Sequence, residues 1–123
     1  MATNPYNNAP QQGRAPGYTE AWALIEAARR MADSVDSPEP KRAMKEGIRL
    51  NWRLWTIFQA DLSADESIPA EIRSNLLSLC QFIDKYSVEA LIEPEVKHIE
   101  ALVNINRNIA SGLLAGIEAQ EQA

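Results

Sequence analysis

The chain has 123 residues, of which 46% are apolar and 24% charged, so it has the size and composition of one globular domain. No run of 18 apolar residues occurs, and the opening MATNPYNNAPQQGRAPG lacks the apolar core of a signal peptide. These features exclude a transmembrane helix and a secretory signal, and they favour a cytoplasmic protein. The formal net charge of −5 disfavours broad nucleic-acid binding, which requires a basic surface.

Chemistry-bearing residues are scarce in this sequence. Cys80 and His98 are each the only residue of their type, so neither an internal disulfide nor a standard zinc cluster is available. Cys80 lies on an apolar helical arc, which predicts a small buried side chain, whereas the position of His98 beside charged residues predicts a surface histidine. No nucleophile–base motif and no phosphate-binding loop occurs. We therefore predict no enzymatic activity, no cofactor and no metal site.

Residues 1–17 contain three prolines, two glycines and a run of Asn and Gln. Such a segment cannot bury enough apolar surface to offset its conformational entropy, which predicts a disordered arm. The domain itself is expected at 18–118 as a single helical unit, followed by a frayed polar tail at 119–123.

Two helices are predicted in the first half of the domain. The first spans 19–35, with Thr19 as its N-cap and a narrow apolar stripe about 120° wide. The second spans 38–61, with Ser37 as N-cap and Pro38 in the first turn. Its apolar arc is about 220° wide, more than a surface helix requires. This helix is therefore either central in the bundle or reserves part of its arc for a partner.

The second half of the domain predicts two further helices. The third spans 68–92 and is opened by Pro69, with a possible break at Ser87 and Val88. The fourth spans 94–118 and begins at Pro94. Its two glycines, Gly112 and Gly116, indicate either a closely approaching neighbour or fraying. The predicted fold class is all-α, a small four-helix bundle with a disordered N-terminal arm.

Two polar residues lie in the middle of apolar stripes, Asn51 in the second helix and Asn106 in the fourth. A buried unpaired amide costs about 1–3 kcal/mol, so both should find partners. In the structural interpretation they bond to each other or to helix backbone and fix the register of the two helices. In the functional interpretation one of them faces a groove and bonds the backbone of a partner.

The second helix also carries the only basic concentration in the chain, a stripe that consists of Arg42, Lys45, Arg49 and Arg53. This basic stripe is either a solvated helix face or a site for an acidic partner. Trp55 is near the centre of its apolar arc and is predicted to be core, whereas Trp22 and Trp52 lie off-centre and are candidates for exposed binding anchors.

Two sequence runs resemble the FlaF family of alphaproteobacterial flagellar biosynthesis regulators. The run from Asn51 to Leu62, NWRLWTIFQADL, is similar to the family signature, and the run from Leu102 to Leu113, LVNINRNIASGL, is similar to its C-terminal motif. Ile68-Pro69 and the run from Asn75 to Leu79 resemble the start of the family's third helix. Gly17-Tyr18 and the helix that follows resemble the beginning of the family's sequence. The likeness covers about residues 18–117, which makes the first 17 residues an extension before the usual start.

The resemblance implies a small all-α protein needed for flagellin production, acting with or against the translational regulator FlbT. The mechanism we expect is a cytoplasmic flagellin chaperone that covers the amphipathic terminal segments of flagellin, which become helical in the filament, and promotes secretion. Alternatives are regulation through FlbT or flagellin mRNA without flagellin binding, and a homodimer that uses the surplus apolar arc. The predicted partner-binding residues are Trp22, Arg49, Asn51, Trp52, Arg53, Phe58, Asn106 and Arg107.

Overall fold

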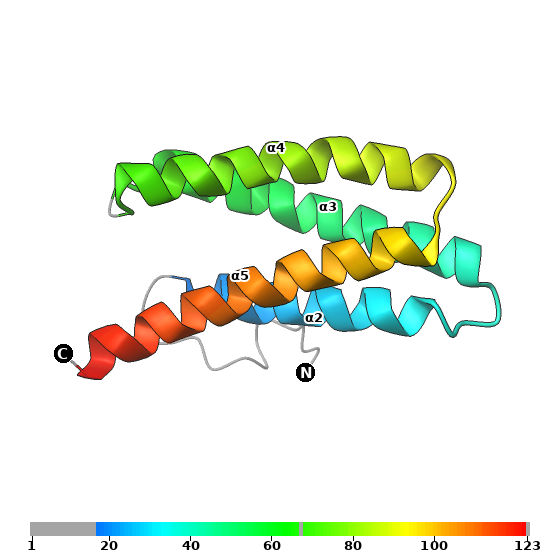
Figure 1. The fold of residues 1–123 in the computed structure, drawn as a ribbon, viewed down its shortest axis with the longest axis horizontal. Coiled ribbons are helices and arrows are strands. Elements are labelled where there is room, and N and C mark those ends of the chain that lie inside the picture. Colours follow the sequence, from blue (N-terminus) through cyan, green and yellow to red (C-terminus); the bar gives the residue numbers. More distant parts are fainter. Residues whose placement is uncertain (1–16, 67, 123) are drawn as a thin grey trace, which may run out of the picture.

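The computed structural model describes residues 17–66 and 68–122, so the predicted arm lies outside the described residues except for Gly17. The described chain forms four helices joined by short turns (Figure 1). They are α2 (Tyr18–Ser34), α3 (Pro40–Ala64), α4 (Ala70–Ile92) and α5 (Val96–Gln122). The described part of the chain contains no strand, which confirms the predicted all-α four-helix bundle.

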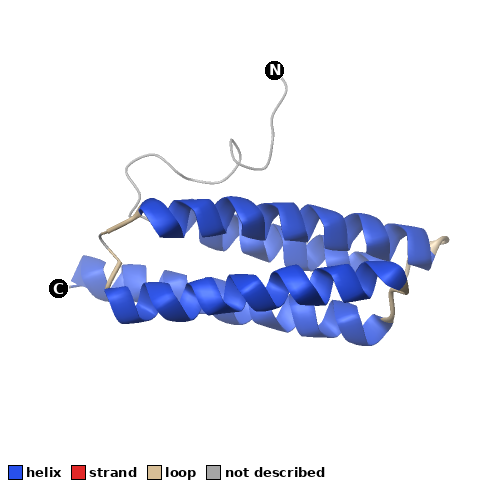
Figure 2. Cartoon of the chain, turned by 90° about the horizontal axis from the view of Figure 1, so that it is seen from above, coloured by secondary structure: helices blue, strands red, loops and turns tan. Residues whose placement is uncertain are grey.

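The helices pack as two connected pairs. α2 packs against α5 and α3, and α3 packs against α4, whereas α4 and α5 share few contacts although they are joined by a short turn. Figure 1 shows α3 and α4 together in one half of the molecule and α2 with α5 in the other. The long axes of all four helices run in nearly the same direction, as the perpendicular view shows (Figure 2). The bundle is therefore closed around α2 and α3 and less closed between α4 and α5.

The starts of α2, α3 and α4 have no side-chain cap, so the side-chain caps expected at Thr19 and Ser37 are not used. α2 begins at Tyr18 with Gly17 as its N-cap in the left-handed region (φ 96°), so Thr19 lies inside the helix. α3 begins at Pro40 instead of Pro38. The Ser37 hydroxyl accepts a hydrogen bond from the Glu39 amide (3.2 Å), which stabilises the turn before the helix instead of its first turn. Pro69 is the N-cap of α4, with its carbonyl accepting the Arg73 amide at 2.9 Å.

The later helices are longer and more continuous than expected. α4 passes through Ser87 and Val88 without a break, because Ser87 is fully buried in the bundle and tertiary packing outweighs its low helix propensity. α5 begins at Val96 and continues to Gln122, past the expected end at residue 118. The close approach expected at Gly112 and Gly116 is absent, since a Cβ at either position would meet nothing within 4 Å among the described residues.

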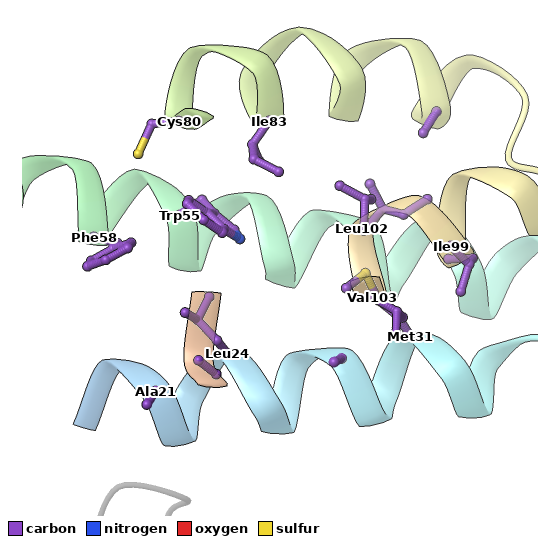
Figure 3. Close-up of a cluster of buried hydrophobic side chains, with 14 of the residues drawn as sticks. Ala21, Leu24, Met31, Trp55, Phe58, Cys80, Ile83, Ile99, Leu102 and Val103 are labelled. Carbon is purple, nitrogen blue, oxygen red and sulfur yellow. The ribbon is translucent and has the colours of Figure 1, made fainter. Parts of the chain in front are cut away.

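The core receives side chains from all four helices. Figure 3 shows the cluster around the indole of Trp55, with Leu24 of α2, Ile83 of α4 and Leu102 of α5 on the surrounding elements. Each of these four side chains is 0–1% exposed. Trp55 also meets Phe58 edge to face, with ring centroids 5.5 Å apart. α2 and α3 approach closely at Gly47, where a Cβ would lie 3.3 Å from Cγ of Met31.

Candidate partner-binding surface

Asn51 and Asn106 meet in the centre of the bundle. Asn106 Nδ2 donates to Asn51 Oδ1 (2.7 Å) and to the Leu24 carbonyl (3.1 Å), while its Oδ1 accepts the Trp55 indole N–H (2.9 Å). Both asparagines are 0% exposed. The structural interpretation is therefore confirmed, and the assignment of these two residues to a partner-binding surface is wrong for this conformation, because no part of either side chain reaches solvent.

Phe58 is also placed in the core. Its side chain is 6% exposed and packs edge to face on Trp55. Its assignment as a partner contact is corrected for the same reason as the two asparagines. The prediction that Trp55 is a core residue is confirmed.

Trp52 lies half-buried between α3 and α4. Its indole N–H donates to Asp84 Oδ1 of α4 at 2.9 Å, so the polar edge of the ring is used within the bundle. The ring lines a shallow depression of about 570 Å³, together with Thr56, Asp84 and Val88. Trp52 is thus available to a partner only along one side of its ring.

Trp22 and Arg107 are exposed, as expected of partner contacts. Trp22 is 40% exposed on α2 and lies beside Tyr18, with ring centroids 6.4 Å apart. Arg107 is exposed on α5. Among the described residues, no ring contact, hydrogen bond or ion pair joins Trp22, Trp52 and Arg107, so the structure does not bring them together through direct contacts.

The basic stripe of α3 lies on the surface. Arg49 and Arg53 are exposed, and no ion pair involves either guanidinium within the described range. Lys41 pairs with Glu93 at 2.7 Å, and this contact lowers the pKa of the Glu93 carboxyl and raises that of Lys41. Both groups are largely solvated, so the pair contributes little to stability. Arg42 of the basic stripe pairs with Glu39 at 3.8 Å, whereas Lys45, Arg49 and Arg53 form no ion pair among the described residues.

α4 carries four exposed large apolar side chains among the described residues, and none of its residues was assigned as a partner contact from the sequence. Phe82 is 46% exposed and stacks on Tyr86 (centroids 5.3 Å apart), whose ring meets His98 of α5 edge to face. Residues at spacings of 7, 10 and 14 along a helix share one face. The stripe on the side of α4 toward α5, here called the α4 stripe, consists of Ile72, Leu79, Phe82 and Tyr86.

His98 is buried at 5% exposure, so its predicted surface position is wrong. Its Nδ1 accepts the Glu95 amide (3.0 Å) and thereby caps the first turn of α5, while Tyr86 covers its ring. A helical wheel places this residue between two faces and does not reveal a local cap, which explains the error. The sequence feature that could have indicated this cap is the short spacing between the helix start at Pro94–Glu95 and the histidine.

Cys80 is 1% exposed, which confirms the prediction of a buried thiol. Burial, assisted by the charge of Asp84, raises its pKa to about 11. Residues 17–66 and 68–122 contain no group of three or more metal-ligating side chains. In the same part of the chain no helix is both long enough and apolar enough to cross a bilayer.

A family model described as flagellar protein FlaF matches residues 2–113. The chain belongs to the FlaF family. This match includes most of residues 1–17, so treating them as an extension before the family start is wrong; a segment without apolar periodicity gave no pattern to recognise. Both motif runs of the FlaF resemblance lie within the match. Neither a curated protein nor a solved structure matches the chain at a significant level.

The FlaF motifs are largely explained by the core. Asn51, Trp55 and Asn106 form the buried hydrogen-bonded cluster that joins the two motif helices. Membership in the family makes the chain a flagellar protein. The motifs therefore identify the fold.

Proposed function

We propose that this FlaF-family protein binds flagellin in the cytoplasm as an export chaperone, which prevents premature assembly and promotes secretion. The observation that supports the proposal is the α4 stripe, an exposed apolar surface on a flagellar protein. A monomeric bundle gains nothing from leaving Phe82 and Ile72 about half exposed. An amphipathic segment that lays its apolar face on this stripe would bury both surfaces.

The open packing between α4 and α5 supports the same proposal. α4 is held by α3, and its contact with α5 is concentrated where Tyr86 meets His98 near the connecting turn. Away from that turn the two helices diverge (Figure 1). An added helix lying along α4 would therefore need no disruption of the α2–α5 or α2–α3 contacts.

The test is a calorimetric titration with monomeric flagellin, intact and with its terminal segments removed. We expect micromolar or tighter binding to intact flagellin and loss of binding after truncation. A double variant, I72S/F82S, should weaken binding at least tenfold, whereas Ile92→Ser, which is 77% exposed at the far end of α4, should have little effect. No heat and no complex with intact flagellin would refute the chaperone proposal.

A second candidate is regulation through FlbT or through flagellin mRNA without contact with flagellin. The exposed, unpaired Arg49 and Arg53 favour it, because free cations on a helix face suit an acidic partner. Charge reversal by Arg49→Glu should then abolish binding to the flagellin leader RNA or to FlbT, and binding should weaken steeply with salt. If neither partner binds at low salt, this candidate fails.

A further inference from the structure

A small apolar pocket with an acidic rim lies between the first turns of α2 and the C-terminal half of α3. Its volume is about 110 Å³. Leu54, Ile57 and Phe58 of α3 line it together with Ala23 of α2. Glu20 and Asp61, here called the acidic rim, also line it. Ile57 is 52% exposed despite lying against this pocket.

The pocket has the size and lining of a site for an aliphatic side chain. Its volume is several times the roughly 30 Å³ that one water molecule occupies in the liquid. Its lining is mostly apolar, so water there gains few hydrogen bonds and is displaced readily by methyl groups. An aliphatic side chain entering between Leu54 and Ile57 would bury apolar surface on both partners at about 25 cal/mol per Å².

The rim of the pocket has an unbalanced negative charge. Glu20 is half-buried, and burial raises the pKa of its carboxyl, with the charges of Asp61 and Asp65 adding to the effect. No lysine or arginine lines the pocket, and no ion pair involves Glu20 or Asp61 within the described residues. A cation placed between Glu20 and Asp61 would favour the charged form of Glu20 and offset its repulsion with Asp61.

We propose that this pocket is a second contact for the bound flagellin, where an aliphatic side chain enters between α2 and α3 and a neighbouring arginine or lysine pairs with Glu20 and Asp61. The inference rests on the proposed function for the identity of the partner. It is independent of the α4 stripe, which lies on another helix. The argument for a basic–aliphatic segment is charge complementarity to the rim combined with the apolar lining.

The first test compares two double variants in calorimetric titrations with intact flagellin. E20Q/D61N removes the acidic rim with isosteric amides, and E46Q/E100Q removes two exposed carboxylates elsewhere and matches the change in net charge. We expect E20Q/D61N to weaken binding on the order of tenfold and to reduce its salt dependence, with E46Q/E100Q close to wild type. Ile57→Ser should weaken binding without changing the salt dependence. Equal affinities for the rim variant and its control would overturn the proposal.

The second test does not depend on flagellin. N-acetyl-leucyl-arginine amide is titrated into the ¹⁵N-labelled protein, with N-acetyl-leucyl-glutamine amide as the uncharged control. We expect saturable shifts of the amides of residues 19–24 and 54–61, weaker with the glutamine peptide and lost in E20Q/D61N. Scattered or absent shifts would overturn the assignment of a basic–aliphatic ligand.

The two tests separate the failure of this inference from failure of the proposed function. If wild type does not bind flagellin but the arginine peptide shifts the pocket, the proposed function fails and the ligand chemistry of the pocket stands. The chain itself is another source of a basic side chain, since Arg14 precedes α2 in the sequence. If Arg14→Gln raises the pH at which the Glu20 resonances titrate, or if E20Q/D61N dissolves a dimer, the occupant is the chain itself and the assignment to flagellin is overturned.

Discussion

At the scale of single residues, three buried polar side chains connect three helices. Asn106 of α5 reaches the Leu24 carbonyl of α2, and both Asn51 and Trp55 of α3. Asn51 contributes less, because its Oδ1 accepts one bond and its buried Nδ2 has no partner. The two asparagines are equally buried and equal in size, so they form a natural comparison.

We predict that Asn106→Ala destabilises the fold more than Asn51→Ala does. Loss of Asn106 leaves the Trp55 indole N–H and Asn51 Oδ1 unpaired, which should cost about 3 kcal/mol or more. Loss of Asn51 removes one bond together with an amide that is already unpaired, which should cost about 1–2 kcal/mol including the cavity. Urea unfolding of the two variants checks the order, with Asn104→Ala as the exposed control. A reversed order would contradict the hydrogen-bond assignment.

The thiol of Cys80 should be inert in the folded protein. Its pKa of about 11 against the ordinary 9.0 reduces the thiolate fraction near pH 8 by about a hundredfold, and burial blocks access as well. We expect iodoacetamide to alkylate Cys80 at pH 8 only through unfolding, at a rate that follows the unfolded fraction as urea is added. Mass spectrometry of the native protein measures this rate. Alkylation as fast as that of an unfolded cysteine peptide would contradict the burial.

At the scale of the helices, the number and approximate spans were predictable because periodic apolar residues and prolines delimit them. The residues at which the helices begin and end were less predictable. Thr19 and Ser37 have good capping chemistry, yet Gly17 and Glu39 are the N-caps, because the preceding turn and the packing of the first helical turn decide the boundary. The continuity of α4 at Ser87 was hidden for a similar reason, since burial against neighbouring helices does not appear in local propensity.

Gly112, which has open space around it, and Gly47, which lies against Met31, give a prediction at the scale of the helices. Gly112 lies in the interior of α5 with no described atom near its missing Cβ, so Gly112→Ala should stabilise the fold by about 0.5–1 kcal/mol. Gly47→Ala should gain less or lose stability, because its Cβ would lie 3.3 Å from Met31 Cγ. Thermal unfolding of both variants tests the contrast. Equal stabilisation would show that α2 and α3 adjust at no cost.

At the scale of the whole molecule, Glu20 of the acidic rim makes stability depend on pH. Because the pKa of Glu20 is raised in the folded state, that state binds the proton more tightly than the unfolded chain does. The contribution of Glu20 to stability is therefore fully present below its unfolded pKa and is lost as pH rises through the folded pKa.

We accordingly expect Glu20→Gln to be more stable than wild type at pH 7. The two proteins should converge in stability below the ordinary pKa of 4.5, where the wild-type carboxyl is protonated in both states. Urea unfolding across this range measures the effect, with Glu118→Gln as an exposed control on α5. A wild type that is more stable than Glu20→Gln at pH 7 would indicate a stabilising partner for the carboxylate.

The surface was harder to predict than the fold. On a wide apolar arc, core residues and exposed ones have the same periodicity, so Phe58 and Asn51 were assigned to the surface and Phe82 was not. Which flank of the arc is covered depends on which helices become neighbours. That information comes from pairings such as α2 with α5, which local sequence patterns do not encode.

The pairing of the first described helix with the last has a consequence for synthesis of the protein. The bond from Asn106 to the Leu24 carbonyl joins residues separated by 82 positions, so the core cannot close on a nascent chain until α5 has left the ribosome. Until then α2 and α3 lack the apolar cover that α5 provides. The molecule should therefore complete its fold only after translation is essentially finished, and stalled or truncated chains should be substrates for proteolysis.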